Sequence, residues 1–449
     1  MKKVTVDFSK TVGPVKPMHA VNNGPVRSVR GTGNFDAFVD AGIPYMRNHD
    51  AAFLDSYGGP HTVDVLNIFT DFDADENDPA SYDFTLTDRY CQTCTDTGGE
   101  VFYRLGSRIE HAVKKYQTRP PKDYAKYARI CEHIIRHLCY GWADGLHLPI
   151  TYWEIWNEPD CGSEKEGYDW RKGDNPCWQG PHEEFLKFYE VMAKHLKGCF
   201  PDLKIGGPAY TACKEGKREP VEFAEYMRDH DVPLDFFSFH RYHTDPKELA
   251  ANCVYTRQLM DRYGFTETET VLNEYNYVIS FHGEEMNTSY DVMKNEKGAA
   301  FTAACILAMQ KTPLDMLMYY DFRPCMYSGP FESGTYRLRK PYWPFWYFNK
   351  LYRLGQEAAS ENDEDVYVCA AKGDAGAAVE VAYYRNEEPE EEEIEIEMKG
   401  LSGRTRFVTY LTDKDHDNAK IRTDVFTGEE GSIILSVKPS SVIGIFTEE

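Results

Sequence analysis

The chain lacks any run of about 18 apolar residues, the length that a helix needs to cross a bilayer. Its first stretch, MKKVTVDFSK, starts with two lysines but has no apolar segment behind them, so it does not resemble a secretory signal peptide. We therefore expect no membrane span and a cytoplasmic protein.

Basic residues are also in short supply. The chain has 50 Lys and Arg against 73 Asp and Glu, which leaves a formal net charge of −23. A field of this sign repels phosphate backbones and anionic lipid headgroups. Nucleic acid and membrane surfaces are therefore not expected among its partners.

The 12 cysteines lack the regular spacing of a disulfide framework, and we expect buried free thiols. Cys91 and Cys94 have zinc-knuckle spacing, but no second pair follows at a workable distance, so we interpret them as packing residues of a helix. Cys161 and Cys177 bracket the loop 160–180, where a disulfide is disfavoured in a reducing compartment.

Short apolar runs alternate with amphipathic stretches between about residues 15 and 350, which indicates a parallel sheet. The clearest helical periodicity covers 121–140, 182–198 and 296–311. A doubly wound sheet is the alternative, but no G-x-G-x-x-G turn follows an early strand. Eight strands in about 330 residues favour a (β/α)8 TIM barrel. The expected strands are 18–23, 43–49, 101–107, 149–156, 204–209, 235–240, 270–275 and 315–321.

After about residue 360 the pattern changes to short β-prone runs separated by Gly, Asn or Asp, as in an antiparallel β-sandwich. These runs are 365–371, 377–384, 392–398, 404–411 and 432–447. We expect a catalytic barrel at 10–355 and a sandwich domain at 360–449. The alternating segment within 1–9 is a candidate extra strand of that sandwich, and the acidic run 387–393 is interpreted as a solvated hairpin loop.

Two glutamates stand at the ends of expected barrel strands, where the active sites of such barrels lie. Glu158 follows the fourth strand and Glu274 ends the seventh, so the two face each other across the mouth. Because Glu158 precedes Pro159, we expect an extended conformation there. Glu154 is interpreted as a supporting residue deeper in the barrel. Carboxyl groups about 5–5.5 Å apart suit a retaining glycosidase, and roughly 6.5–9.5 Å would leave room for an inverting water.

The motif "WNEPD" at 156–160, followed by "LNEYN" at 272–276, resembles the retaining glycoside hydrolases of clan A, family 39, which includes β-xylosidases and α-L-iduronidases. "YMRNHDAAF" at 45–53 and "DFFSFHRYHTD" at 235–245 are similar to that family's second and sixth strands. "YDFTLTDRY" at 82–90, with "GGEVFYRLGS" at 98–107, is similar to the family's stretch that leads into its third strand. The resemblance covers most of the chain and also implies a C-terminal β-sandwich.

The resemblance implies roles for individual residues. Glu158 matches the acid/base, Glu274 the nucleophile, and Asn157 the amide that binds the sugar's 2-hydroxyl. Arg47 is expected to orient a carboxylate such as Glu274. The remaining expected substrate-binding residues are His49, His240, Tyr242 and Tyr319.

The implied activity is retaining, exo-acting hydrolysis of oligosaccharides or other glycosides by double displacement, with no metal or organic cofactor. A β-xylosidase-like activity is expected first. A β-galactoside, β-glucoside, α-L-arabinoside or uronide as substrate stays open, as does a non-catalytic carbohydrate-binding barrel. A homo-oligomer is also open, since family members are often oligomers.

The chain departs from the family pattern after the eighth strand, where it reads Tyr319-Tyr320-Asp321-Phe322-Arg323-Pro324 in place of Tyr-Trp-x-x-Ser-Asp. The basic loop 322–342 would favour an anionic sugar such as a uronate, or would simply offset an acidic protein. Trp170 and Trp178 are candidates for a sugar-stacking platform. His240, His243 and Asp245 carry metal-ligand atoms, but the resemblance already explains His240, so we expect no metal site there.

Overall fold

The computed structural model of the protein describes residues 1–27, 32–50, 61–387 and 390–448. Eight parallel strands close into a barrel in chain order, with β2 pairing to β9. This confirms the predicted TIM barrel, and each strand falls on an expected run. The strands are β2 (Ala20–Asn22), β3 (Tyr45–Arg47), β4 (Glu100–Leu105), β5 (Tyr152–Ile155), β6 (Lys204–Tyr210), β7 (Phe236–His240), β8 (Glu269–Tyr275) and β9 (Met316–Tyr319).

The barrel interior is divided into an apolar layer and a polar layer. Side chains alternate along a strand, so each strand sends every second residue inward. Phe102, Tyr152, Phe236 and Met318 belong to one compact apolar cluster of the barrel. Beyond it, towards the strand ends, buried polar residues take over, and these build the site described below.

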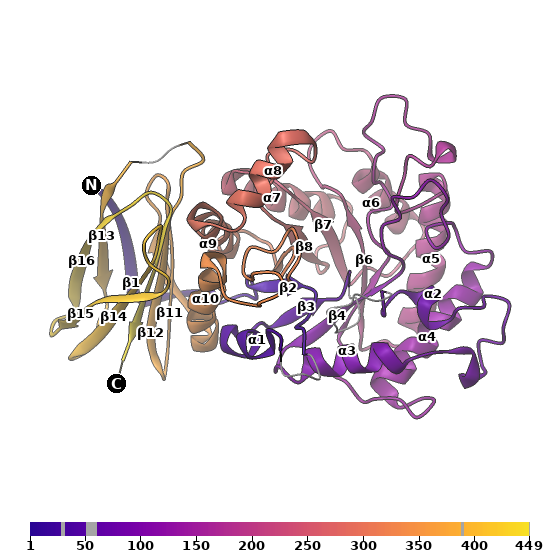
Figure 1. Ribbon diagram of the computed structural model, residues 1–449, viewed down its shortest axis with the longest axis horizontal. Coiled ribbons are helices and arrows are strands. Elements are labelled where there is room, and N and C mark those ends of the chain that lie inside the picture. Colours follow the sequence, from indigo (N-terminus) through magenta and orange to yellow (C-terminus); the bar gives the residue numbers. More distant parts are fainter. Residues whose placement is uncertain (28–31, 51–60, 388–389, 449) are drawn as a thin grey trace.

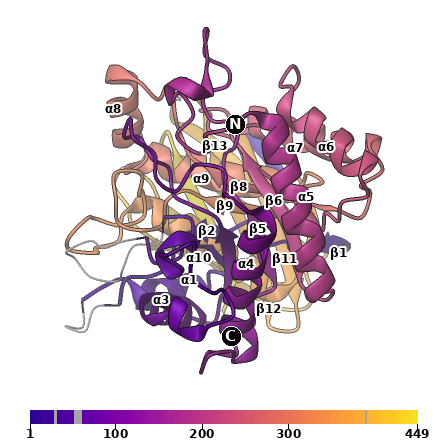
Figure 2. The same cartoon turned by 90° about the vertical axis from the view of Figure 1, so that its right-hand side faces the viewer.

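The predicted helices are present as α4 (Tyr124–Tyr140), α5 (His182–Cys199) and α9 (Glu296–Gln310). Asp123 begins α4 by accepting a hydrogen bond from the Lys126 amide, which satisfies one of the free N–H groups of the first turn. Figure 2 shows α4 and α5 on the side of the barrel away from the C-terminal sheet. None of the described helices is long and apolar enough to cross a membrane. The other helices are α1 (Phe35–Ala41), α2 (Val65–Ile68), α3 (Thr85–Thr95), α6 (Glu219–Asp229), α7 (Pro246–Arg262), α8 (Gly283–Val292) and α10 (Trp343–Leu354).

The alanine-rich helix α9 is apolar on nearly all sides because it is buried between two layers. It packs against barrel helix α7 and against three strands of the C-terminal sheet, β11 (Val366–Gly373), β12 (Gly376–Tyr383) and β17 (Ser441–Thr447). With α10 it fills the space between barrel and sheet (Figure 1). These two helices therefore join the two parts of the molecule.

The C-terminal part is a nine-stranded sheet that encloses its own apolar core, as the predicted sandwich does. The strand order is β15-β14-β17-β12-β11-β10-β1-β13-β16, and within the described residues of this sheet only the β1–β13 pair is parallel. The expected run 432–447 is two strands, separated near Ser440 in a left-handed conformation with φ of 61°. β10 and β15 had no predicted counterpart. The strands are β1 (Lys2–Pro14), β10 (Gln356–Glu361), β11 (Val366–Gly373), β12 (Gly376–Tyr383), β13 (Glu392–Lys399), β14 (Thr405–Thr412), β15 (Ala419–Phe426), β16 (Glu430–Val437) and β17 (Ser441–Thr447).

All 12 cysteines are free thiols, and eight of them are buried, which confirms that prediction. Cys91 and Cys94 are buried packing residues of α3, also as predicted. Asp245 caps the N-terminus of α7, and its amide donates to His243, so these two serve the local turn. Residues 51–53 of the motif at 45–53 and residues 388–389 of the acidic run lie outside the described residues.

Candidate active site

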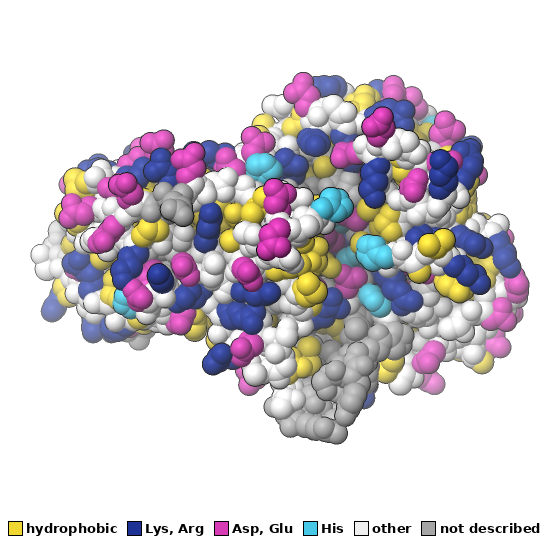
Figure 3. All heavy atoms as spheres, turned by 45° about the horizontal axis from the view of Figure 1, so that its top comes forward, with side chains coloured by type: hydrophobic (Ala, Val, Ile, Leu, Met, Phe, Trp, Pro, Cys, Tyr) yellow, Lys and Arg dark blue, Asp and Glu magenta, His cyan; other side chains and the backbone are white. Residues whose placement is uncertain are grey.

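The polar residues at the carboxyl ends of the barrel strands converge on one mouth. Arg47 ends β3, His240 ends β7, and Glu274 stands one residue before the end of β8. Glu158 follows β5 by three residues. Seen as spheres, the barrel is hollowed where histidine side chains gather, while charges of both signs mix over the rest of this face (Figure 3).

Glu158 is not extended, as its place before proline had led us to expect. Its φ is 47°, and Trp156 two residues earlier has φ of 74°, so the chain turns sharply after the strand. The Glu158 amide donates to the Ala209 carbonyl of β6 at 3.0 Å. Left-handed residues other than glycine persist where surrounding contacts hold them, and this bond to the neighbouring strand is such a contact.

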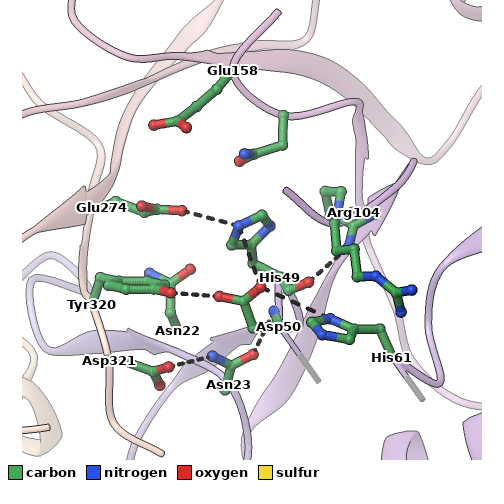
Figure 4. A network of polar contacts seen from close by, with 12 residues as sticks. Asn22, Asn23, His49, Asp50, His61, Arg104, Glu158, Glu274, Tyr320 and Asp321 are labelled. Carbon is green, nitrogen blue, oxygen red and sulfur yellow. Dashed lines mark hydrogen bonds and ion pairs between the residues drawn. The ribbon is translucent and has the colours of Figure 1, made fainter. Parts of the chain in front are cut away.

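The carboxyl groups of Glu158 and Glu274 lie close together, as predicted. One carboxylate oxygen of Glu158, one of Glu274 and a ring nitrogen of His240 all lie within 4.8 Å of one another. The His240 Nδ1 atom is 2.8 Å from Glu158 Oε1 and 3.4 Å from Glu274 Oε2. Figure 4 shows both carboxylates facing the same space, with His49 beside Glu274.

Arg47 connects the polar layer of the barrel. This fully buried guanidinium donates to Glu274 Oε1 at 2.7 Å and to Glu154 Oε2 at 2.6 Å. It also donates to Asn157 Oδ1 at 2.6 Å and Asn22 Oδ1 at 3.0 Å. A planar fork with five N–H donors is suited to holding several acceptors at once. Arg47 thus orients Glu274 and Asn157 together.

Glu154 and Tyr242 complete the support of the carboxylates. Glu154 is fully buried and accepts from Ser238 at 2.6 Å and Asn273 at 2.5 Å, beneath the mouth. The Tyr242 hydroxyl donates to Glu274 Oε2 at 2.7 Å. Both Glu274 oxygens are therefore engaged, one by Arg47 and one by Tyr242.

Burial sets the protonation states of the site. Burial raises the pKa of Glu158 to about 8, and the negative charge of Asp160 adds to this effect. The positive charges of Arg47 and Lys217 act in the opposite direction. Burial also raises the pKa of Glu274, while His240, Arg47 and the Tyr242 hydroxyl act to lower it. Burial lowers the pKa of His240 to about 4. At neutral pH, Glu158 is therefore protonated beside a neutral histidine.

Three predicted substrate-binding residues each keep one buried polar atom without a partner among the described residues. These atoms are Asn157 Nδ2, His49 Nδ1 and His240 Nε2. Buried polar groups are normally hydrogen-bonded, so these unmatched atoms on three residues of the site call for an explanation. A polyhydroxylated ligand would supply the missing partners.

The structure does not bring Tyr319 to the site. Met316 and Met318 point into the barrel, so Tyr319 points outward. It packs edge-on against Tyr275 and Phe345 at 5.6 and 5.5 Å. The assignment of Tyr319 to substrate binding therefore finds no support, because strand alternation places it in the outer core.

Tyr320 stands near the site instead. From the sequence, neither Tyr320 nor Asp50 is assigned to the site. The Tyr320 hydroxyl donates to Asp50 Oδ2, and the Asp50 amide donates to Asn23 Oδ1 at 2.9 Å (Figure 4). Burial acts to raise the pKa of Asp50, but His49, Arg323 and Tyr320 together lower it below its usual value. Asp50 is therefore a carboxylate anion beside His49. The only sequence feature that indicates Asp50 as a site residue is its position directly after His49.

The two tryptophans of the loop 160–180 differ. Trp178 is fully buried and packs edge-on against Trp156 at 5.2 Å, so it offers no sugar platform. Trp170 is half-buried and, with Tyr168, lines a cavity of about 600 Å³ between the loop, α5 and α6. Asp160 also lines this cavity, whereas Glu158 and Glu274 do not.

Comparison with known proteins finds a matching family model and curated relatives. A model of the family described as Glycosyl hydrolases family 39 matches residues 3–333. A β-xylosidase of Geobacillus stearothermophilus is 24% identical over 304 residues, which cover 63% of this chain and 54% of that protein. A β-xylosidase of Caldicellulosiruptor saccharolyticus is 27% identical over 233 residues, covering 49% and 44%. These matches span about half the length of each curated relative.

The fold is shared with solved structures. The crystal structure of a glucosidase from Croceicoccus marinus superimposes with a TM-score of 0.80 at 20% identity, over 100% of this chain and 99% of that one. At this identity the likeness shows the barrel and sheet architecture alone.

Proposed function

Because the chain belongs to glycosyl hydrolases family 39, we propose that it is a retaining, exo-acting glycosidase with Glu158 as acid/base and Glu274 as nucleophile. The observation that carries the proposal is the close approach of these two carboxylates, whose nearest oxygens lie within 4.8 Å together with His240. Retaining enzymes hold their carboxyl groups about 5–5.5 Å apart, whereas inverting enzymes need roughly 6.5–9.5 Å.

In the first step, protonated Glu158 gives its proton to the leaving oxygen while Glu274 attacks the anomeric carbon. The pKa of about 8 at Glu158 keeps the acid form present at neutral pH. Arg47 and Tyr242 hold the two Glu274 oxygens and favour its ionised form. The result is a glycosyl ester of Glu274 and a released alcohol.

In the second step, Glu158 acts as the base. Once Glu274 is esterified, its negative charge is gone, and a nearby negative charge is one of the causes that raise a carboxyl pKa. Ionised Glu158 then takes a proton from water, and the water oxygen attacks the anomeric carbon and releases Glu274. The product keeps the anomeric configuration of the substrate.

The hydrogen-bonding groups around the carboxylates support a neutral glycone. Asn157 is held by Arg47 through its oxygen, which leaves its Nδ2 donor for the sugar's 2-hydroxyl. His49 Nδ1 and His240 Nε2 are the further available atoms. We take a β-xyloside as the first substrate, since both curated relatives are described as β-xylosidases.

The positively charged side chains of the loop 322–342 are engaged by other groups of the protein, which argues against a uronide as the substrate. Arg323 donates to the Asp50 carbonyl at 2.6 Å and pairs with Asp321 at 3.2 Å. Arg337 pairs with Glu332, and Lys340 pairs with Asp417. Arg339 donates to the Phe331 carbonyl at 3.1 Å. The Asp50 carboxylate lies next to His49 and would repel a sugar carboxylate.

A panel of aryl glycosides tests the proposal, with β-xyloside, β-glucoside, β-galactoside, α-L-arabinoside and iduronide as substrates. We expect β-xyloside cleavage by the wild type and no measurable turnover by Glu274→Ala. NMR of the first-formed sugar should show the retained anomer, and an inverted product would exclude the double displacement. Release of single sugars from a xylo-oligosaccharide tests exo action, and shortened oligosaccharides without monosaccharide would exclude it.

A further inference from the structure

Two cysteines lie directly beside the proposed acid/base, in a place that the glycosidase mechanism does not use. The Sγ atoms of Cys161 and Cys177 and one carboxylate oxygen of Glu158 all lie within 4.8 Å of one another. The Cys177 thiol is 3.8 Å from Glu158 Oε2. His240 contacts the other carboxylate oxygen, Oε1. Both thiols are free.

The backbone holds these three groups in place. The Cys161 amide donates to the Glu158 carbonyl at 3.0 Å, which makes a tight turn of residues 158–161. The Cys177 amide donates to Asn175 Oδ1 at 2.8 Å, and its carbonyl accepts from the Trp156 indole at 2.9 Å. Fully buried Asn175 also donates to the Pro159 carbonyl at 2.7 Å, so one side chain ties the Cys177 segment to the Glu158 turn.

The donor set is that of a thiophilic metal ion. Two sulfur ligands and one carboxylate oxygen suit zinc-like cations, whereas Mg²⁺ and Ca²⁺ prefer oxygen alone. Sulfur atoms about 2.3 Å from a tetrahedral zinc stand roughly 3.8 Å apart, which lies within the 4.8 Å that already bounds the separations of the three ligand atoms. Cys161 is partly exposed, and the Glu158 side chain is 12% exposed, so these two ligands are reachable from solvent.

We propose that Glu158, Cys161 and Cys177 form a binding site for a thiophilic divalent cation such as Zn²⁺ or Cd²⁺, and that the bound ion inhibits by occupying the Glu158 carboxylate. On binding, the two thiols and Glu158 release their protons to solvent, and the ion accepts lone pairs from two sulfurs and one oxygen. Glu158 then has no proton to give to a leaving group. The inhibition rests on the proposed acid/base role of Glu158, but the ion site does not.

The other ligand clusters among the described residues contain fewer thiols. Glu158, His240 and Glu274 contain none, and Glu132, His195 and Cys199 contain a single one. They provide matched comparisons, because Cys161→Ser leaves both of them intact and Cys199→Ser disrupts only the distant one.

The experiment titrates the reduced, metal-free full chain with Cd²⁺ and follows the ultraviolet thiolate-to-cadmium absorbance. We expect one site with two thiolates in the wild type and in Cys199→Ser. Cys161→Ser and Cys177→Ser should each weaken binding by at least about tenfold and remove one thiolate's share of the absorbance. A wild type without two-thiolate absorbance, or Cys161→Ser that binds Cd²⁺ as the wild type does, would overturn the site.

Inhibition is measured separately, as the ratio of each variant's activity with Zn²⁺ to its own metal-free activity. We expect Zn²⁺ to inhibit the wild type and Cys199→Ser, with recovery on adding a chelator, and Cys161→Ser to resist. If Cys161→Ser is inhibited equally, the ion acts elsewhere and the inhibitory part of the proposal is wrong. If the chain cleaves no glycoside, the proposed function fails while the cadmium titration still decides the ion site.

Discussion

Replacing Arg47 by lysine tests the arrangement on which both carboxylates depend. Arg47 donates to Glu154, Glu274, Asn157 and Asn22, and it is fully buried. A lysine keeps the positive charge but places its three donors at one point, so it cannot reach all four acceptors. At least two buried acceptors then lose their donor.

The expected loss of stability follows from those contacts. Each unsatisfied buried acceptor costs about 1–3 kcal/mol, and more when it is charged, so Arg47→Lys should lower the free energy of unfolding by about 2–6 kcal/mol. Catalysis should fall further, by about 10²-fold or more in kcat/KM, since the proposed nucleophile Glu274 loses its orientation. The lysine pairs with one carboxylate at most, and we expect it to leave Glu274 less well stabilised as an anion.

The direction in which Arg47→Lys shifts the pH profile follows from the effect of Arg47 on the pKa of Glu274. Arg47 acts to lower the pKa of Glu274, which burial raises above its ordinary value. Weakening that contact raises the Glu274 pKa further, so the acidic limb of the kcat/KM profile should move to higher pH. As the proposed nucleophile, Glu274 must be ionised, and activity should therefore be lost as pH falls through its pKa.

The assay combines urea unfolding with pH profiles on an aryl β-xyloside. Ser238→Ala is the control, because it removes the hydroxyl that donates to Glu154 at 2.6 Å but makes no contact with Glu274. It should lower stability by about 1–3 kcal/mol and leave the acidic limb in place. If Arg47→Lys unfolds like the wild type and keeps its acidic limb, Arg47 does not support Glu274 as described.

Other predictions concern single groups. Glu158→Gln should lower kcat/KM about 10²–10⁴-fold on poor leaving groups and abolish the loss of activity as pH rises through about 8; an unchanged basic limb would mean that another acid acts. Tyr320→Phe removes the donor to the Asp50 carboxylate and should cost about 1.5–3 kcal/mol in urea unfolding, whereas no change would show that this contact is not stabilising. Glu380 is fully buried on β12 without a hydrogen bond among the described residues, and burial raises its pKa well above 4.5. The unfolded chain ionises it first as pH rises, so wild-type stability should decline above about pH 4.5, and Glu380→Gln should remove that slope. Equal slopes in the two proteins would contradict this account.

The sequence alone determined the barrel and the two glutamates. Apolar runs of strand length, spaced by amphipathic helices, allow few arrangements other than a parallel barrel. "WNEPD" and "LNEYN" each put a glutamate at the end of such a run, and barrel closure brings β5 and β8 to the same mouth. Both signals are local in sequence, which is why they could be read from it.

The rest depended on contacts between segments far apart in the chain. Arg47 could be assigned to one carboxylate, but only the closed barrel shows that it holds Glu154 as well. Tyr320 replaces Tyr319 near the site because inward and outward positions alternate along β9, and a shift of one residue reverses the face. The left-handed Glu158 is held by a bond to Ala209 on the next strand, and no local preference before proline predicts it. Strand identity thus follows from local pattern, whereas the partner of each buried polar atom is decided by tertiary structure, because it comes from another strand.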